Sequence, residues 1–222
     1  MEKIIFWNVD TQYDFMRDDD SYRGKLAVPG ARDIEDNLFS LTQYARENNY
    51  DVINTADWHI WGDAEISREP NFVSTYPMHC EREKLGAKFV PATAPLNPYI
   101  IDCRNGKYEE DKVKAERNIV LYKNQFDVFA GNKLTKEVVN LKNPNSVIVY
   151  GVALNVCDDF AIMGNIEAGR KVYAVLDAMK DLPHLAQTPL ATNLVLERWK
   201  ANNVRFVTTK DVLEGRLKWN LL

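Results

Sequence analysis

The sequence is poor in the residues that build disulfide frameworks. Its 222 residues include only three cysteines, Cys80, Cys103 and Cys157, and three histidines. An odd and small number of cysteines argues against a set of paired disulfides, so we expect reduced thiols. Reduced thiols are compatible with a cytosolic protein that carries a reactive cysteine.

Long apolar runs and a surplus of basic charge are also missing. No apolar run reaches the length of a signal sequence or a membrane-spanning helix. The 28 basic and 32 acidic residues are interspersed and give a formal charge of -4, which leaves no basic stripe for nucleic acid and no polybasic patch for a membrane. We expect a cytoplasmic protein that acts on a small molecule and binds neither nucleic acid nor membrane.

The chain is long and apolar enough to form one globular domain over residues 1–222, with 45% hydrophobic residues. Apolar runs and helical spacings alternate, with helices expected over 31–48, 133–141, 158–168, 188–202 and a short C-terminal segment. Six strands separated by helices predict a mainly parallel, doubly wound sheet. The predicted strands are 4–9, 51–55, 118–121, 146–151, 172–176 and 204–207.

The stretch 58–118 breaks this alternation. It is long, irregular and rich in proline, asparagine and charge. Connections of this length commonly carry function or cover a site. Within it, 97–114 is expected to cover the site or to build a subunit interface.

Cys157 is the most informative single residue. The buried strand 146–151 precedes it, and a helix is predicted to begin at the thiol. A helix N-terminus at the carboxyl end of a strand favours the thiolate, which is the nucleophilic form. An inert, buried thiol is an equally good interpretation of Cys157 taken alone.

Asp10 and Lys123 occupy matching positions after other predicted strands. If those strand ends converge on one crevice, Asp10 can accept the Cys157 proton, and Lys123 can lower the pKa of the thiol. Individually, Asp10 fits a turn or helix cap and Lys123 a solvated charge. Their shared topological position favours an activated nucleophile.

A second cluster has the composition of a metal site. Asp57 and His59 are two apart in an extended segment and point to the same side, and His79 can supply a second imidazole. One carboxylate with two histidines suits a divalent ion with open positions. A turn-capping Asp57 and an ordinary His59 remain the alternative. The third histidine, His184, is expected to be structural or solvated.

In combination, these segments resemble the isochorismatase-like cysteine hydrolases, and within them the nicotinamidase-like branch. The resemblance spans nearly the whole chain, and its specificity comes from the order of several short motifs. One departure is Ile60, which stands where many relatives have proline, and another is the charged segment 81–84. The matching motifs are Val9–Phe15, Leu26–Ala31, Thr55–His59, His79–Cys80 with Gly86–Ala87, Lys123 with Phe126 and Phe129, and Gly151–Cys157.

The resemblance implies a three-layer α/β/α sandwich around a six-stranded sheet. It implies that Asp10, Lys123 and Cys157 form a catalytic triad, and that a cis peptide at Val152–Ala153 turns the Ala153 and Cys157 amides into an oxyanion hole. It also implies a homo-oligomer.

The same resemblance implies metal ligands, and the positions of nearby residues indicate substrate contacts. Asp57, His59 and His79 would bind one divalent ion, zinc in the first instance, with iron or manganese as alternatives. Four residues beside the motifs are expected to contact a flat substrate ring, and Trp7 is a further candidate, although aromatic residues next to strands are commonly core. The expected contacts are Phe15, Trp58, Tyr122 and Val152.

The expected activity is amide hydrolysis through a Cys157 thioester, with nicotinamide as the first candidate substrate. Other amide or carbamoyl hydrolases share the cysteine triad, and a vinyl-ether hydrolase shares the fold but requires neither thiol nor metal. From a different class, a catalytically silent binding or adaptor protein can use the same scaffold.

Overall fold

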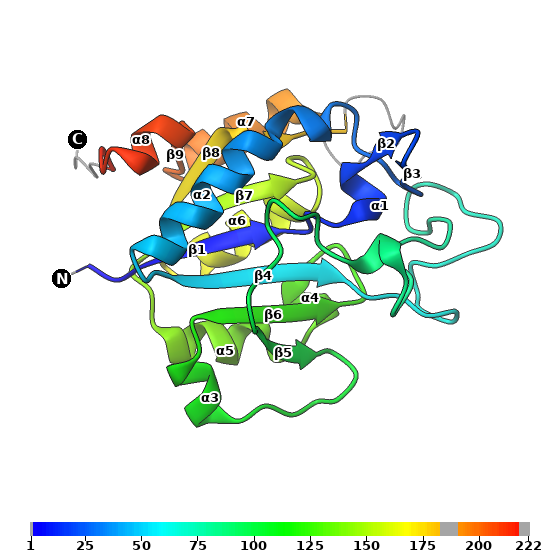
Figure 1. The fold of residues 1–222 in the computed structure, drawn as a ribbon, viewed down its shortest axis with the longest axis horizontal. Helices are drawn as coiled ribbons and strands as arrows, with labels where there is room; N and C mark the ends of the chain where they lie inside the picture. The colour runs from blue at the N-terminus through cyan, green and yellow to red at the C-terminus, as the bar shows by residue number, and fades with distance from the viewer. Residues whose placement is uncertain (1, 183–190, 218–222) are drawn as a thin grey trace.

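The computed structural model describes residues 2–182 and 191–217. A seven-stranded sheet, parallel throughout, runs through the molecule with helices on both faces (Figure 1). The three-layer α/β/α class is therefore confirmed. In sheet order the strands are β5 Tyr99–Asp102, β6 Asn118–Lys123, β4 Asp51–Asp57, β1 Ile4–Val9, β7 Ser146–Val152, β8 Lys171–Lys180 and β9 Arg205–Val207. A small ribbon of β2 Asp18–Asp19 and β3 Tyr22–Arg23 lies apart.

Amphipathic helices cover the two faces. One face carries α2 and α8, and α2 buries Leu38, Leu41 and Ala45 at the three- and four-residue spacing of a helical stripe. The opposite face carries α4, α5, α6 and α7. The helices are α2 Glu35–Glu47, α8 Thr209–Leu213, α4 Val128–Gly131, α5 Thr135–Lys142, α6 Cys157–Glu167 and α7 Thr192–Ala201, with short turns at α1 Tyr13–Met16, η1 Ala31–Ile34, η2 Leu85–Ala87 and α3 Glu110–Ala115.

The predicted count of six strands is wrong by one. The seventh strand, β5, lies inside the stretch 58–118 that the sequence predicted to be irregular, as do η2 and α3. β5 is a four-residue edge strand that pairs only with β6 and buries one apolar side chain, Ile101, while Ile100 stays 48% exposed. Three of its four residues are apolar, but so short a run inside an irregular stretch does not distinguish a strand from a loop.

For the other helices and strands, most of the predicted ends lie within a few residues of the observed ends. Part of the expected helix 188–202 lies outside the described residues, as does His184; within them, α7 begins at Thr192. Over 2–182 and 191–217, no helix is long and apolar enough to cross a membrane.

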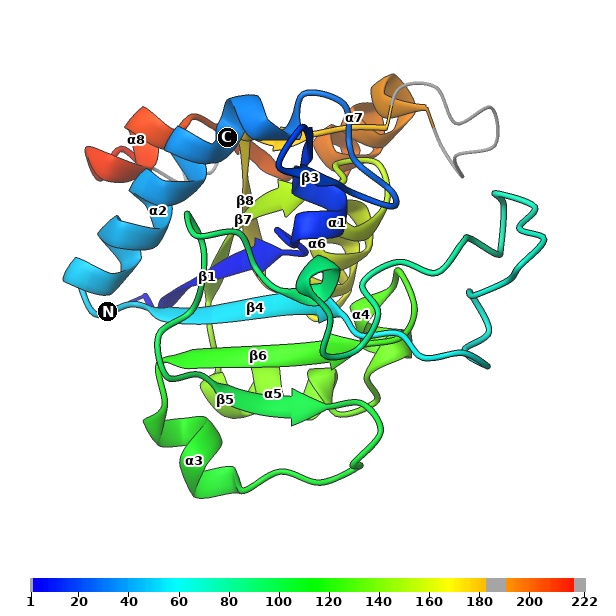
Figure 2. The ribbon, with the colours of Figure 1, turned by 45° about the vertical axis from the view of Figure 1, so that its right-hand side comes forward.

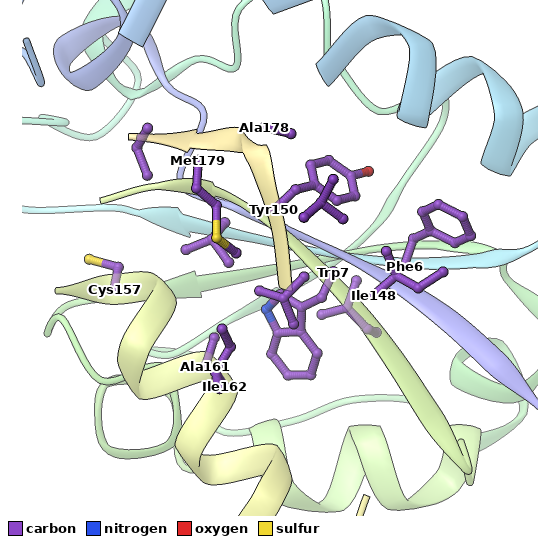
Figure 3. Packing of buried hydrophobic residues seen from close by; sticks show 14 of the residues in the cluster. Phe6, Trp7, Ile148, Tyr150, Cys157, Ala161, Ile162, Ala178 and Met179 are labelled. Carbon is purple, nitrogen blue, oxygen red and sulfur yellow. The ribbon is translucent and has the colours of Figure 1, made fainter. Parts of the chain in front are cut away.

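The core lies between the sheet and its helices, and β7 is buried along its whole length. Figure 3 shows Trp7 of β1 packed beside Ala161 and Ile162 of α6, with Cys157 at the start of the same helix. Trp7 is fully buried and contacts Phe129 at a ring-centroid distance of 6.0 Å. Trp7 is thus a core residue, which corrects its candidacy as a substrate contact.

The carboxyl ends of the strands point to one edge of the sheet, and much of the stretch 58–98 gathers at that edge (Figure 2). Gly151, near the end of β7, makes the close approach of β7 to β1 possible. Its φ is +135°, and a Cβ atom there would lie 2.1 Å from the Val9 carbonyl oxygen. A side chain at position 151 would push apart the two strands that lead to Asp10 and Cys157.

We expect Gly151→Ala to lower the free energy of unfolding by about 2–5 kcal/mol, the sum of an unfavourable φ and a forced contact. Urea denaturation measures this. The matched control is Gly169→Ala, which also has a positive φ, +76°, but has no atom within 4 Å of the added Cβ; it should cost about 1–2 kcal/mol. Equal losses for both variants would contradict the close-approach explanation.

Candidate active site

Four polar or reactive side chains come together where neighbouring strands end. Asp10 follows β1, Asp57 ends β4, and Lys123 ends β6 directly opposite Asp57 in the strand register. Cys157 begins α6, which follows β7. Because β6, β4, β1 and β7 are consecutive in the sheet, all four side chains reach the edge where open α/β sheets bind ligands.

Lys123 is the centre of this cluster. Its Nζ lies 2.9 Å from Asp10 Oδ2 and donates to Cys157 Sγ at 3.7 Å and to the Gln125 carbonyl at 3.1 Å. The Thr55 hydroxyl donates to the other Asp10 oxygen at 2.7 Å. The structure therefore brings together the three residues that the sequence predicted to converge, and none of them is more than 6% exposed.

Asp57 shares Lys123 as a partner and is held by Gln12. Asp57 Oδ1 forms an ion pair with Lys123, and the Gln12 amide group bonds both the N–H and the carbonyl of Asp57, at 2.8 and 2.7 Å. Burial opposes the charge on Asp57, but Lys123 together with His59 and His79 outweighs this effect and keeps the pKa of Asp57 well below its usual range. Burial also opposes the charge on Lys123, yet the two carboxylates raise the pKa of Lys123 well above its ordinary value.

The Cys157 thiol behaves differently from the sequence-based expectation. Complete burial raises its pKa well above the ordinary value, and the negative charges of Asp10 and Asp57 add to this, so that the lowering effect of Lys123 is overcome. Burial, with help from Asp57, also raises the pKa of Asp10. A thiol that rests in its protonated form needs a base, and a raised pKa makes Asp10 a stronger one.

Two backbone amides adjoin the thiol. The Val152–Ala153 peptide is cis, as expected. Within the described residues, neither the Ala153 nor the Cys157 N–H donates to a protein acceptor, and both residues line the same cavity. These two amides are therefore available to a ligand oxygen.

Asp57, His59 and His79 form the second predicted cluster. Asp57 Oδ2 lies 3.8 Å from His59 Nε2 and 3.5 Å from His79 Nε2, and all three side chains are fully buried. Each of these three atoms lacks a hydrogen-bond partner among the described residues. Three buried ligand atoms without partners, within 4.8 Å of one another, fit a divalent ion.

The other ring nitrogens of the two histidines are occupied. His79 Nδ1 donates to the Pro77 carbonyl at 2.8 Å, and His59 Nδ1 lies 3.2 Å from Asp63 Oδ2. Both partners are acceptors, so each Nδ1 carries the proton and each Nε2 presents its lone pair toward Asp57. This is the arrangement of metal-ligating histidines.

A cavity of about 100 Å³ opens beside Cys157, and its lining is almost wholly apolar. Among the expected substrate contacts, Phe15 and Val152 line it. Trp58 and Tyr122 do not; their rings stack on each other at 4.1 Å with 6° between the planes. The described lining residues are Phe15, Leu26, Ala27, Val28, Tyr76, Phe126, Val152, Ala153, Val156, Cys157 and Leu182.

A sequence model of the isochorismatase domain matches residues 5–211. The chain belongs to the isochorismatase family. Its fold is similar to that of the zinc complex of a pyrazinamidase from Pyrococcus horikoshii, with 22% identity, a TM-score of 0.69, and coverage of 93% of this chain and 99% of that one. A search of curated protein sequences gave no significant match.

Two further solved structures show how varied the activities on this fold are. A nicotinamidase from Bacillus subtilis has 20% identity and a TM-score of 0.69 over 93% of this chain and 99% of its own. An N-carbamoylsarcosine amidase from Thermoplasma acidophilum has 15% identity and a TM-score of 0.67 over 93% of this chain and 96% of its own. At such identities the likeness establishes the fold of this isochorismatase-family protein and leaves its substrate open.

Sequence reasoning missed several residues of the site. Gln12 lies inside a recognised motif, but nothing in the motif indicated that its amide fixes Asp57. Tyr76 and Phe126 line the cavity, and Glu65 accepts from the Phe126 N–H at 3.1 Å. Burial, with the charge of Asp57, raises the pKa of Glu65 to about 7. Glu65 and Tyr76 come from the irregular stretch 58–118, whereas Gln12 and Phe126 stand in recognised motifs that do not by themselves indicate these contacts.

Asp158, directly after Cys157, was also missed. It is fully buried, and neither of its carboxyl oxygens has a hydrogen-bond partner among the described residues. Burial raises its pKa well above the usual range, and the charges of Asp10 and Asp159 add to this. The protonated form is therefore favoured in the folded protein.

We expect Asp158→Asn to change how stability depends on pH. A raised pKa in the folded state means that stability falls as the pH rises above the unfolded carboxyl pKa of about 4. The amide of Asp158→Asn has no proton to lose, so the unfolding free energy of the variant should not fall in this way. Its difference from wild type should therefore increase between pH 5 and 8, by up to about 1.4 kcal/mol per pH unit.

Urea unfolding at several pH values measures this difference. Asp20→Asn, at an exposed position, is the control and should show a constant difference from wild type. A constant difference for Asp158→Asn as well would show that the buried carboxyl does not resist ionisation.

Proposed function

We propose that this isochorismatase-family protein is a cysteine amidohydrolase that cleaves a flat, uncharged amide to an acid and ammonia, with nicotinamide as the first candidate. The observation that carries the proposal is the position of Cys157. Its Sγ contacts Lys123 at 3.7 Å on one side, and Cys157 lines the apolar cavity on the other.

The reaction begins with a proton transfer. Asp10 takes the proton from the Cys157 thiol, and the Lys123 ammonium stabilises the thiolate that forms. The thiolate attacks the amide carbonyl carbon, and the carbonyl oxygen becomes an oxyanion. In this proposal the Ala153 and Cys157 N–H groups hold that oxyanion, and one such donor is typically worth about 3 kcal/mol of barrier.

The second half returns the enzyme to its starting state. Asp10 gives its proton to the amide nitrogen, the C–N bond breaks, and ammonia leaves a thioester on Cys157. Water then attacks the thioester carbon as Asp10 takes a proton from it. The C–S bond breaks, the acid departs, and Asp10 returns the proton to the sulfur.

We propose that Asp57, His59 and His79 hold the divalent ion, with zinc as the first candidate and iron or manganese as alternatives. The three buried atoms without partners support this assignment. A bound ion would supply a Lewis-acidic position that orients a ring nitrogen or a water. In this proposal the nucleophile remains the Cys157 sulfur.

The first test is ammonia release from nicotinamide by the purified protein. We expect turnover in the ordinary enzymatic range of about 1–10³ s⁻¹. Cys157→Ala should lower it by at least about 10³-fold, and removal of metal by a chelator should lower it reversibly. Cys103→Ser, which changes a half-buried thiol outside the cavity lining, should retain activity.

Loss of activity in Cys103→Ser but not in Cys157→Ala would overturn the assignment of the nucleophile. No turnover of any amide, neutral or charged, by folded and zinc-loaded wild-type protein would indicate a binding or adaptor protein instead.

A second test uses substrate charge. No charged side chain lines the cavity in the described part of the chain, and a buried charge without a partner is costly. We therefore expect kcat/KM for N-carbamoylsarcosine, which carries a carboxylate, to be at least about 10²-fold below that for nicotinamide. Equal or faster release of ammonia from the charged substrate would reject a neutral amide as the preferred one.

A further inference from the structure

The turn that carries His59 is held from within by Asp63. One oxygen of Asp63, Oδ2, lies 3.2 Å from His59 Nδ1 and accepts from the Ile60 N–H at 3.0 Å. The Asp63 side chain is only 7% exposed. Because His59 Nδ1 is bound to this carboxylate, its ring is fixed with Nε2 toward Asp57.

Arg104 braces the same turn from a distant part of the chain. Its Nη2 donates to Asp63 Oδ2 at 2.7 Å and to the Trp58 carbonyl at 2.9 Å. Trp58 precedes His59, and Asp63 follows it, so one guanidinium joins both sides of the ligand. The Arg104 side chain is 20% exposed, which makes these contacts partly shielded from solvent.

The edge strand β5 sets the position of Arg104. Asp102, its last residue, lies opposite Tyr122 of β6 in the strand register. Asp102 Oδ1 accepts from the Arg104 N–H at 2.8 Å, and the Cys103 N–H donates to the Tyr122 carbonyl at 3.3 Å. Arg104 therefore leaves the sheet at a fixed point.

We propose that Arg104 and Asp63 form a positioning pair that holds His59 as a ligand and thereby sets the metal affinity of Asp57, His59 and His79. This inference rests on the metal site of the proposed function. A carboxylate that accepts from Nδ1 fixes the tautomer and increases the basicity of Nε2. Arg104 neutralises that carboxylate, and its Nη2, which also donates to the Trp58 carbonyl, ties the carboxylate to the backbone and restricts its rotation.

The test is the zinc affinity of metal-free protein, measured by competition with a chromophoric chelator. Asp63→Asn and Arg104→Gln should each weaken zinc binding by about 10–100-fold. If Arg104 acts through Asp63, the double variant should be no weaker than the weaker single variant, because the two effects are not independent. The zinc affinity of Arg104→Lys, which keeps the charge but loses the planar guanidinium, should fall between those of wild type and Arg104→Gln.

The control is Arg82→Gln. The Arg82 N–H donates to the His59 carbonyl at 2.9 Å, but the Arg82 side chain is 46% exposed and pairs with Glu83. The zinc affinity of Arg82→Gln should therefore equal that of wild type. Cobalt substitution adds a spectroscopic readout, since altered His59 ligation should shift the visible absorption bands of Asp63→Asn and Arg104→Gln while those of Arg82→Gln stay unchanged. If Arg104→Gln does not fold, Arg104→Lys carries the comparison.

The outcomes separate the two proposals. A folded wild-type protein that takes up no zinc or cobalt would overturn the proposed metal site. Wild-type protein that binds zinc while Arg104→Gln and Arg104→Lys bind it equally tightly would overturn the positioning pair and leave the metal site intact. Strictly additive losses in the double variant would also overturn the pair, because Arg104 would then not act through Asp63.

Discussion

The whole site depends on one buried ammonium group. Lys123 is 1% exposed and is shared by two carboxylates, Asp10 and Asp57, that are completely buried. Without it, two negative charges on adjacent strand ends would repel each other in a medium that solvates neither. The register that places Asp57 opposite Lys123 is therefore an electrostatic requirement as well as a matter of backbone pairing.

This constraint explains the directions of the pKa shifts around it. Lys123 pairs with both carboxylates, but their pKa values shift in opposite directions. Asp57 remains strongly acidic, while burial and the neighbouring negative charge make Asp10 more basic. Two carboxylates of the same chemical type thus acquire opposite pKa shifts from their surroundings, and it is this difference on which the proposed division between a permanent charge and a proton acceptor rests.

Much of the fold could be predicted from the sequence because its signals are local. Strands such as 4–9 and 146–151 are short apolar runs between helices with regular spacing, and their order implies a parallel sheet. The convergence of Asp10, Lys123 and Cys157 follows from topology, since parallel strands end at one edge. The pairing of Asp57 with two histidines was visible from spacing and from the family resemblance.

The remainder depends on contacts between segments far apart in sequence. The raised pKa of the Cys157 thiol reflects burial and the charges of two carboxylates, which no local sequence pattern contains. β5 forms because it can pair with the free edge of β6, and its own four residues do not predict a strand. Tyr76, Phe126 and Leu182 form the cavity wall from irregular segments, where the position of a side chain is decided by long-range packing.

Asp57 divides its two oxygens between Lys123 and the histidine cluster. A cation bound at one oxygen is stabilised by the same negative charge that stabilises the Lys123 ammonium at the other oxygen. Cation binding and the proton affinities of Asp10 and Cys157 are therefore thermodynamically linked, and the linkage is reciprocal. If a bound cation changes the free energy of moving the thiol proton, then moving that proton changes the free energy of cation binding by the same amount.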